Sequence, residues 1–319
     1  MSSQKHGYII IDCNTTSLDL QPILFLLEYS SVLCVTLTGN EDVSLTKAYN
    51  ETLRILSMIG RFDIPVVRRT SSGIAAPAHC LAHICEKFPH KVTVVCLGPL
   101  TNVAVALQLN RKFQRNVKRV VCASDGFNGR QIISSWNFKT DIEATRQVFS
   151  SRIPVVLLPR NVPCSVSVTS YLNSREGTNG LFSTIFDCND DFLFKASMKK
   201  HPSGVNLQKV ATALVAMKPN LILRKRMVNF RDQIEKFYNS SSDTSESCPT
   251  LSDNRSSLTV SHPTLSTQTV DSFSSEILHG ISRTGNNVLV IEKIDVNGLL
   301  KFYKHIYLIG SKNRTKFIS

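Results

Sequence analysis

Two acids and an amide follow the first apolar run of the chain. Residues of these types at this spacing could form a metal-binding active site. The stretch 7-GYIIIDCNTTSLD-19 carries four apolar residues and then Asp12, Asn14 and Asp19. A short buried strand that ends in polar side chains presents them at the rim of a sheet, where many α/β proteins bind ligands. Two acids are few for such a site. The stretch is therefore either a metal-binding active site or the remains of one.

The elements that must position these residues alternate between strand and helix patterns over the first 160 residues. In the helical segments, apolar residues recur at spacings of three and four. Alternation of this kind predicts βαβ units around a mostly parallel sheet. Strands are expected at 8–11, 32–37, 92–97, 119–123, 154–158 and 287–294, and helices at 20–29, 44–60, 78–88, 101–109, 141–149, 207–217 and 297–308.

Composition and charge exclude several classes of protein. Lys and Arg number 37 against 24 Asp and Glu, a formal net charge of +13. These basic residues lie in short dispersed clusters without a recognised nucleic-acid motif, so we expect no nucleic-acid partner. No run of about 18 apolar residues is present, so no membrane span is expected. The N-terminus lacks the apolar run of a secretory signal, and we expect a cytoplasmic protein.

Cysteine spacing gives no sign of a structural site. The nine cysteines are scattered, and no C-x-x-C pair occurs among them. Neither a zinc site nor a disulfide framework is therefore indicated. Several cysteines lie inside apolar runs, where a thiol usually behaves as a small core side chain.

One segment differs in composition from the rest. The span 239–275 is dominated by Ser and Thr and has little to bury. Such a composition predicts a flexible surface insertion. We expect one domain over residues 1–319 that carries this insertion.

Four segments, in order along the chain, together resemble the inosine–uridine-preferring nucleoside hydrolase family. The first, 12-DCNTTSLD-19, resembles the family's D-x-D-P-G-x-D-D, and 36-TLTGN-40 resembles its second strand, which ends in Gly-Asn. The others are 97-LGPLTNVAVAL-107 and 135-SWNFKTDIEAT-145, the latter similar to E-F-N-x-x-x-D-P-E-A-A. The resemblance implies a single α/β domain of nucleoside-hydrolase type, with a mostly parallel central sheet flanked by helices.

The resemblance also implies a reaction and a site. Family members cleave the N-glycosidic bond of ribonucleosides to free base and ribose, and they hold one Ca²⁺ at the carboxyl ends of the strands. Calcium prefers hard oxygen ligands, and a bound metal with a carboxylate turns water into a nucleophile. The residues that the resemblance places at the substrate are Asn40 and Asn137. It further implies a nucleoside or ribose as ligand, and it allows a homo-oligomer.

At the metal positions the chain departs from the family pattern. Asn14 stands where the metal-ligating general base is expected, and an amide cannot accept the proton of water. Only Asp12 and Asp19 keep acids of the opening motif. Counting back from the end of the helix expected at 207–217 puts Lys209 at the late metal-binding acid. The resemblance thus leaves a degraded metal site, and we expect no bound cofactor.

Lys209 needs a partner if this alignment is right. An unpaired ammonium buried at the metal position would cost several kcal/mol. We therefore expect Lys209 to contact Asp19, with Asp12 as a second partner and Asn14 supplying an amide oxygen. The competing interpretation is a frame error of one or two residues, which would put Lys209 on the solvent face and point Asn206 or Gln208 inward. A separate alternative is that Asp19 is only a helix N-cap.

Three functions remain open from the sequence. The preferred one is a nucleoside hydrolase family protein that is inactive or strongly impaired, a pseudoenzyme, because the calcium and general-base residues are replaced. The second is a ribonucleosidase that is still active through a rearranged site. The third is a non-catalytic binding or interaction protein that uses the basic surface or the Ser/Thr-rich insertion.

Overall fold

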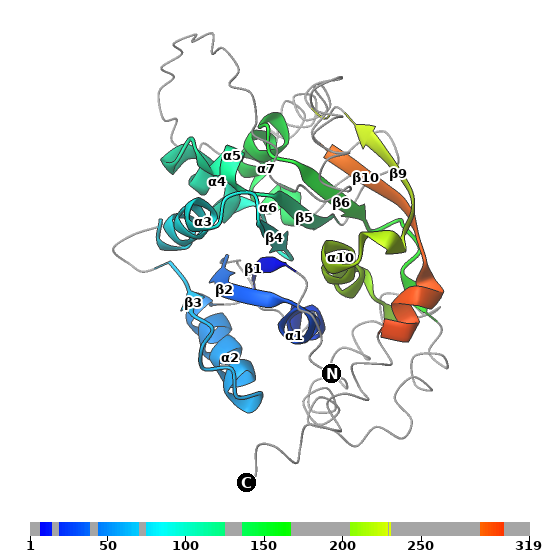
Figure 1. Ribbon diagram of the computed structural model, residues 1–319, viewed down its shortest axis with the longest axis horizontal. Coiled ribbons are helices and arrows are strands. Elements are labelled where there is room, and N and C mark those ends of the chain that lie inside the picture. The colour runs from blue at the N-terminus through cyan, green and yellow to red at the C-terminus, as the bar shows by residue number, and fades with distance from the viewer. Residues whose placement is uncertain are drawn as a thin grey trace.

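An eight-stranded sheet runs through the computed structural model, in the order β3-β2-β1-β4-β5-β6-β10-β9 (Figure 1). The structure describes residues 7–14, 19–38, 44–69, 75–124, 136–166, 205–228, 230 and 288–302. The strands of this sheet are β1 (Tyr8–Cys13), β2 (Ser31–Leu37), β3 (Val66–Val67), β4 (Val92–Cys96), β5 (Arg119–Ser124), β6 (Val155–Pro159), β9 (Ile222–Val228) and β10 (Val288–Ile294). Neighbouring strands pair in parallel, except that β9 runs antiparallel to β10. The predicted mostly parallel α/β sheet is confirmed.

Helices cover both faces of the sheet. One face packs against α1 (Leu20–Tyr29), α2 (Leu45–Met58), α10 (Gln208–Met217) and a helical segment at 296–302. The other face packs against α3 (Ala76–Lys87), α4 (Thr101–Leu109), α5 (Phe113–Asn116), α6 (Trp136–Thr140) and α7 (Ile142–Ser150). A short 3₁₀ helix, Pro219–Leu221, follows α10, and β7 (Ser165–Val166) pairs with β8 (Val205–Asn206) in a separate two-stranded sheet.

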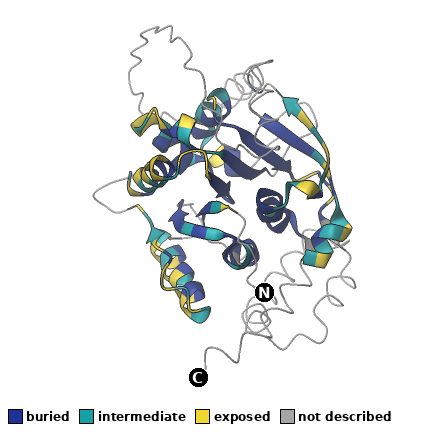
Figure 2. Ribbon diagram, viewed as in Figure 1, coloured by how far each residue is buried: buried dark blue, intermediate teal, exposed yellow. Residues whose placement is uncertain are grey.

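The central strands are apolar on both faces because helices cover both. All residues of β4, β5 and β6 are buried, and β1 is buried from its second residue onward, as the dark blue strands of Figure 2 show. Continuous Val, Ile and Leu runs are typical of parallel strands sandwiched between helix layers. This layered burial fixes the carboxyl ends of β1, β2, β4 and β5 at one rim, next to the first turns of α1, α4 and α10.

Helix ends agree with their sequence signals. The side chain of Ser44 accepts a hydrogen bond from the Lys47 amide at 3.2 Å and so caps α2. Gly60 follows the same helix with φ of 68°, the left-handed conformation expected for a glycine that ends a helix.

Four strands were not predicted, namely the two-residue strands β3, β7 and β8 and the longer β9. At the sheet edge, three of the seven residues of β9 are exposed and the other four are half-buried, and its sequence shows only a basic cluster. Arg224 and Arg226 each lie 3.0 Å from Glu292 on β10, so two of these cations pair across strands. Charged edge strands of this kind resist pairing with other chains. The short helices α5 and α6 were also not predicted, and the Ser/Thr-rich span 239–275 lies outside the described residues.

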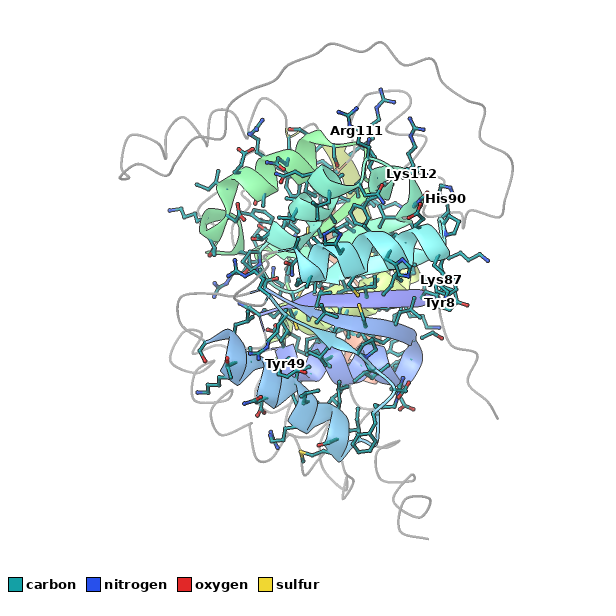
Figure 3. All side chains as sticks on the ribbon, turned by 90° about the vertical axis from the view of Figure 1, so that its left-hand side faces the viewer. Tyr8, Tyr49, Lys87, His90, Arg111 and Lys112 are labelled. Carbon is teal, nitrogen blue, oxygen red and sulfur yellow. The ribbon has the colours of Figure 1, made fainter. Side chains whose placement is uncertain are left out.

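Other basic residues lie away from the carboxyl ends of the strands. Lys87 and His90 lie beside Tyr8, at the start of β1, and Arg111 and Lys112 lie further along the same side (Figure 3). The Lys112 ammonium lies 3.7 Å from Glu86, and both side chains are exposed. Within the described ranges, no helix has the length and apolar character needed to cross a membrane.

Candidate active site at the carboxyl ends of the strands

Asp12 joins three elements through its carboxylate. It is fully buried near the end of β1. Its Oδ1 accepts hydrogen bonds from Thr36 Oγ1 at 2.6 Å and from Asn102 Nδ2 at 2.8 Å, and its Oδ2 accepts one from Thr38 Oγ1 at 3.4 Å. Thr36 lies on β2, Thr38 follows it, and Asn102 lies in the first turn of α4. Asp12 therefore holds the ends of β1 and β2 to the start of α4.

Burial is the dominant influence on the ionisation of Asp12. It raises the pKa of the carboxyl from 3.8 to about 6, although the hydrogen bonds from Asn102, Thr36 and Thr38 lower it in part. A carboxyl whose pKa is higher in the folded protein than in the unfolded chain binds its proton more tightly when folded. Its contribution to stability is therefore present below pH 3.8 and is lost as the pH rises through about 6.

This shift predicts a pH-dependent effect of Asp12→Asn. The wild-type carboxyl should lose about 2 kcal/mol of stabilisation between pH 4 and pH 7, at ~1.4 kcal/mol for each pKa unit. The variant has no proton to exchange there, so its stability relative to wild type should improve by that amount over the same range. Urea unfolding at pH 4, 5, 6 and 7 measures the difference. A difference that stays constant with pH would contradict the prediction.

Asn14 presents a buried acceptor without a donor. Its side chain is 5% exposed, and Oδ1 has no hydrogen-bond partner among the described residues. The turn after β4 packs closely on it, because a Cβ added at Gly98 would lie 3.4 Å from the Asn14 amide nitrogen and 3.5 Å from its Cγ. An unsatisfied buried acceptor costs about 1–3 kcal/mol, and in native proteins such a group calls for an explanation. Asn14 Oδ1 is thus an unused hydrogen-bond acceptor at the carboxyl end of β1.

Lys209 and Asp19 form an ion pair between α10 and the start of α1. Lys209 Nζ donates a hydrogen bond to Asp19 Oδ1 at 2.5 Å. The Asp19 side chain is fully buried, and the Lys209 side chain is 19% exposed. Asp19 immediately precedes α1, but its side chain does not cap that helix. The predicted contact is confirmed, and the alternatives that put Lys209 on the solvent face or make Asp19 a helix N-cap are wrong.

Asp12 and Asn14, the other two partners expected for Lys209, do not hydrogen-bond to its ammonium. The Asp12 carboxylate is held instead by Thr36, Thr38 and Asn102, and Asn14 Oδ1 receives no hydrogen bond from the ammonium. Hydroxyl and amide donors on the strands and on α4 satisfy Asp12 without any cation. The cluster therefore divides into Asp12 with its uncharged hydrogen-bond donors and an ion pair at Asp19.

Gln208 fixes the helix that carries Lys209. Its buried side chain donates through Nε2 to the Ser124 carbonyl at 2.7 Å and to the Leu158 carbonyl at 3.0 Å. These carbonyls lie at the ends of β5 and β6. The first turn of α10 is therefore tied to the rim of the sheet, and this orients the adjacent Lys209 toward Asp19.

The two asparagines expected at the substrate have different outcomes. Asn40 lies outside the described residues. Asn137 is buried in α6, beside Phe138, which packs edge-on against Phe149 at 5.3 Å. No hydrogen bond joins Asn137 to Asp12, Asn14 or Lys209 in the part of the chain that the structure describes. Its role at a ligand stays a prediction.

The described residues do not fit a calcium ion. They contain no group of three His, Cys, Asp or Glu that could hold a metal. The Asp19 carboxylate is neutralised by an ammonium, and Asp12 accepts three hydrogen bonds. Calcium takes six to eight oxygen ligands, several of them usually carboxylates. Of the side chains Asp12, Asn14 and Asp19, only Asn14 keeps an oxygen without a hydrogen-bond donor in the described part of the chain, and one neutral amide is a weak ligand set.

Three side chains of this site were not predicted from the sequence. They donate the hydrogen bonds that hold Asp12, and they are Thr36, Thr38 and Asn102. A usable signal existed for the threonines, because 36-TLT-38 places hydroxyls at the end of an otherwise apolar strand. Gln208 does point inward, as the competing interpretation expected, since its side chain is buried.

Comparison with known proteins identifies sequence relatives over most of the chain. A family model described as inosine-uridine preferring nucleoside hydrolase matches residues 68–301. The chain is 30% identical over 256 residues to probable uridine nucleosidase 2 of Arabidopsis thaliana, which covers 67% of this chain and 78% of the relative. It is 26% identical over 251 residues to the pyrimidine-specific ribonucleoside hydrolase RihA of Citrobacter koseri. This match covers 67% of this chain and 80% of the relative.

Solved structures share the fold at low identity. The purine-preferring ribonucleoside hydrolase from Gardnerella vaginalis superimposes with a TM-score of 0.70 at 16% identity, covering 96% of this chain and 99% of that one. The plant nucleoside hydrolase PpNRh1 superimposes with a TM-score of 0.68 at 18% identity, covering 94% and 98%. These structures bear on the fold alone.

Proposed function

Because the chain belongs to the inosine–uridine-preferring nucleoside hydrolase family, we propose that it is a calcium-independent member that hydrolyses ribonucleosides poorly or not at all. The observation that carries the proposal is the contact of 2.5 Å between Lys209 Nζ and Asp19 Oδ1. In this proposal, the ammonium supplies the positive charge that the family takes from a metal ion.

An ammonium cannot replace the chemistry of a metal ion at this place. A bound divalent metal lowers the pKa of a coordinated water and so generates a nucleophile near neutral pH. The ammonium of Lys209 carries one charge and has three donors and no acceptor, so it orders a carboxylate without activating water. Its hydrogen bond to the fully buried Asp19 also removes that carboxylate from a metal. The pair therefore supports structure and not hydrolysis.

The described residues offer no replacement for the general base. Asn14 stands at the expected position, and its amide cannot accept a proton. Asp12 is the neighbouring carboxylate, but it is fully buried, and both its oxygens accept hydrogen bonds from Thr36, Thr38 and Asn102. This arrangement argues against the alternative of an active enzyme with a rearranged site.

Ligand binding without cleavage is a second candidate function, and Asn14 favours it. Its buried Oδ1 lacks a donor among the described residues. A ligand hydroxyl would satisfy that oxygen and remove the penalty of an unpaired acceptor. A ribose or nucleoside carries such hydroxyls, so the chain could bind the family's ligand and leave its glycosidic bond intact.

A reducing-sugar assay on inosine and uridine, with calcium and with a chelator, tests the proposal. Loss of a general base alone typically lowers rates by ~10²–10⁴-fold. We therefore expect release of ribose to stay at background in both conditions, while an active family member assayed in parallel releases it. Metal-dependent release at about one turnover per second, within the usual range for enzymes, would refute the proposal.

A further inference from the structure

Two thiols from different elements meet on the face of the sheet covered by α3. Cys34 lies on β2 and Cys80 on α3, and their Sγ atoms are 3.4 Å apart. Cys34 is buried and Cys80 is partly exposed, and both are free thiols. They are brought together by the packing of Ala78 and Leu81 of α3 into the same apolar cluster as Cys34. The contact joins residues 46 positions apart in the sequence.

We propose that Cys80 and Cys34 form a site of reversible oxidative modification that reacts with small hydroperoxides. A disulfide has its sulfur atoms about 2.05 Å apart, so closure requires the two sulfurs to approach by roughly 1.4 Å. Side-chain rotation of a partly exposed cysteine on a helix surface can supply a movement of that size. The two thiols take no part in the ion pair of Asp19 and Lys209 at the carboxyl ends of the strands.

Cys80 is the thiol that reacts first. It is the more exposed of the two, and the hydrogen bond with Cys34 lowers its pKa, which favours the nucleophilic thiolate. The same hydrogen bond and burial raise the pKa of Cys34, which keeps Cys34 as the resolving thiol. Elsewhere, burial raises the pKa of Cys122 and Cys164 to about 12, so those thiols stay protonated and inert.

The reaction balances with a hydroperoxide as the only oxidant. The Cys80 thiolate attacks one peroxide oxygen, the O–O bond breaks, and hydroxide or an alkoxide leaves, which gives a sulfenic acid on Cys80. The Cys34 sulfur then attacks the Cys80 sulfur, the S–O bond breaks, and water leaves with the thiol proton. Two thiols are oxidised to one disulfide, and the peroxide is reduced to water or to an alcohol and water.

The cross-link would fasten α3 to the strand that helps to hold Asp12. Side chains two residues apart on a strand share one face, so Cys34 and Thr36 point to the same side of β2. Thr36 donates the 2.6 Å hydrogen bond to Asp12. Oxidation should therefore raise the thermal stability of this part of the fold, and a thiol reductant should reverse the rise.

Mass spectrometry of the full chain after peroxide treatment tests the proposal. Reduced protein is treated with hydrogen peroxide, free thiols are blocked, and the protein is digested without reductant. Trypsin leaves Cys13 with Cys34 in one peptide and Cys80 with Cys85 in another. We expect these two peptides to become linked with a mass loss of two hydrogens, and dithiothreitol should separate them again. The melting temperature of the protein should rise on oxidation and fall back on reduction.

Matched variants assign the link. Cys13→Ser and Cys85→Ser should keep it, whereas Cys34→Ser and Cys80→Ser should abolish it. In Cys34→Ser, the sulfenic acid should persist on Cys80 and react with dimedone several-fold faster than any group on Cys122. A link that survives Cys34→Ser or Cys80→Ser, the absence of any link in wild type, or labelling of Cys80 no faster than of Cys122 would each overturn the proposal.

Discussion

Replacing Lys209 with methionine is expected to lower the free energy of unfolding by about 3 kcal/mol. Removal of one partner from a buried ion pair typically costs 3–5 kcal/mol, because the other charge stays buried without compensation. Asp19 is fully buried and Lys209 is 19% exposed, so the lower end of that range applies. Methionine preserves most of the side-chain length, and the loss therefore reports on the charge. Urea unfolding at neutral pH, followed by circular dichroism, gives the value.

Two comparisons separate this pair from an ordinary surface contact. The pair Lys112–Glu86 is 3.7 Å apart and its side chains are 74% and 50% exposed, so Lys112→Met should change stability by less than about 1 kcal/mol. Adding Asp19→Asn to Lys209→Met also removes the carboxylate charge that Lys209 balanced, and the double variant should recover part of the loss. Equal effects of Lys209→Met and Lys112→Met on the free energy of unfolding would show that the buried pair contributes no more to stability than an exposed pair.

Restoring carboxylates at two positions is expected to produce calcium-dependent stability. The double variant Asn14→Asp, Lys209→Asp places acids at both positions where the family resemblance predicts metal-ligating acids, beside the retained Asp19. Without calcium, three neighbouring carboxylates repel one another, and the protein should be less stable than wild type. With a dissociation constant on the order of 10⁻⁴ M, calcium at 100 times that value would return about 2.7 kcal/mol.

That gain corresponds to a rise of roughly 5–10 °C in melting temperature, at about 2–4 °C for each kcal/mol. Lys209→Asn alone serves as the control, since it removes the ammonium and adds no acid, and it should not respond to calcium. A double variant that melts at the same temperature with calcium and with a chelator would show that the two positions do not face one site.

The fold followed from the sequence wherever burial dominates. Long apolar runs such as β4 and β6 have one physical solution, a strand covered on both faces, and the helices between them show clear apolar periodicity. β9 was not predicted as a strand because its edge position exposes nearly half of its residues. The charged side chains of 222-ILRKRMV-228 therefore mask the alternation typical of a strand. Edge strands depend on pairing with their neighbour, which a local pattern does not contain.

The site was predictable only where charge demanded a partner. Lys209 could be assigned to Asp19 because a cation at a buried position must meet an acid. The partners of Asp12 could not be assigned in the same way, since hydroxyl and amide donors such as Thr38 and Asn102 are neutral and can be satisfied almost anywhere. Asp12 was therefore expected to share Lys209, whereas three neutral donors hold it.

The central claim is that the ammonium of Lys209 stands in for the calcium ion of the family. Calorimetric titration of the wild-type protein with calcium, beside the Asn14→Asp, Lys209→Asp variant, tests it most directly. We predict no saturable heat for wild type up to millimolar calcium and a saturable binding curve for the variant. Saturable binding of calcium to the wild-type protein, with a dissociation constant on the order of 10⁻⁶ M as in calcium sensors, would contradict it.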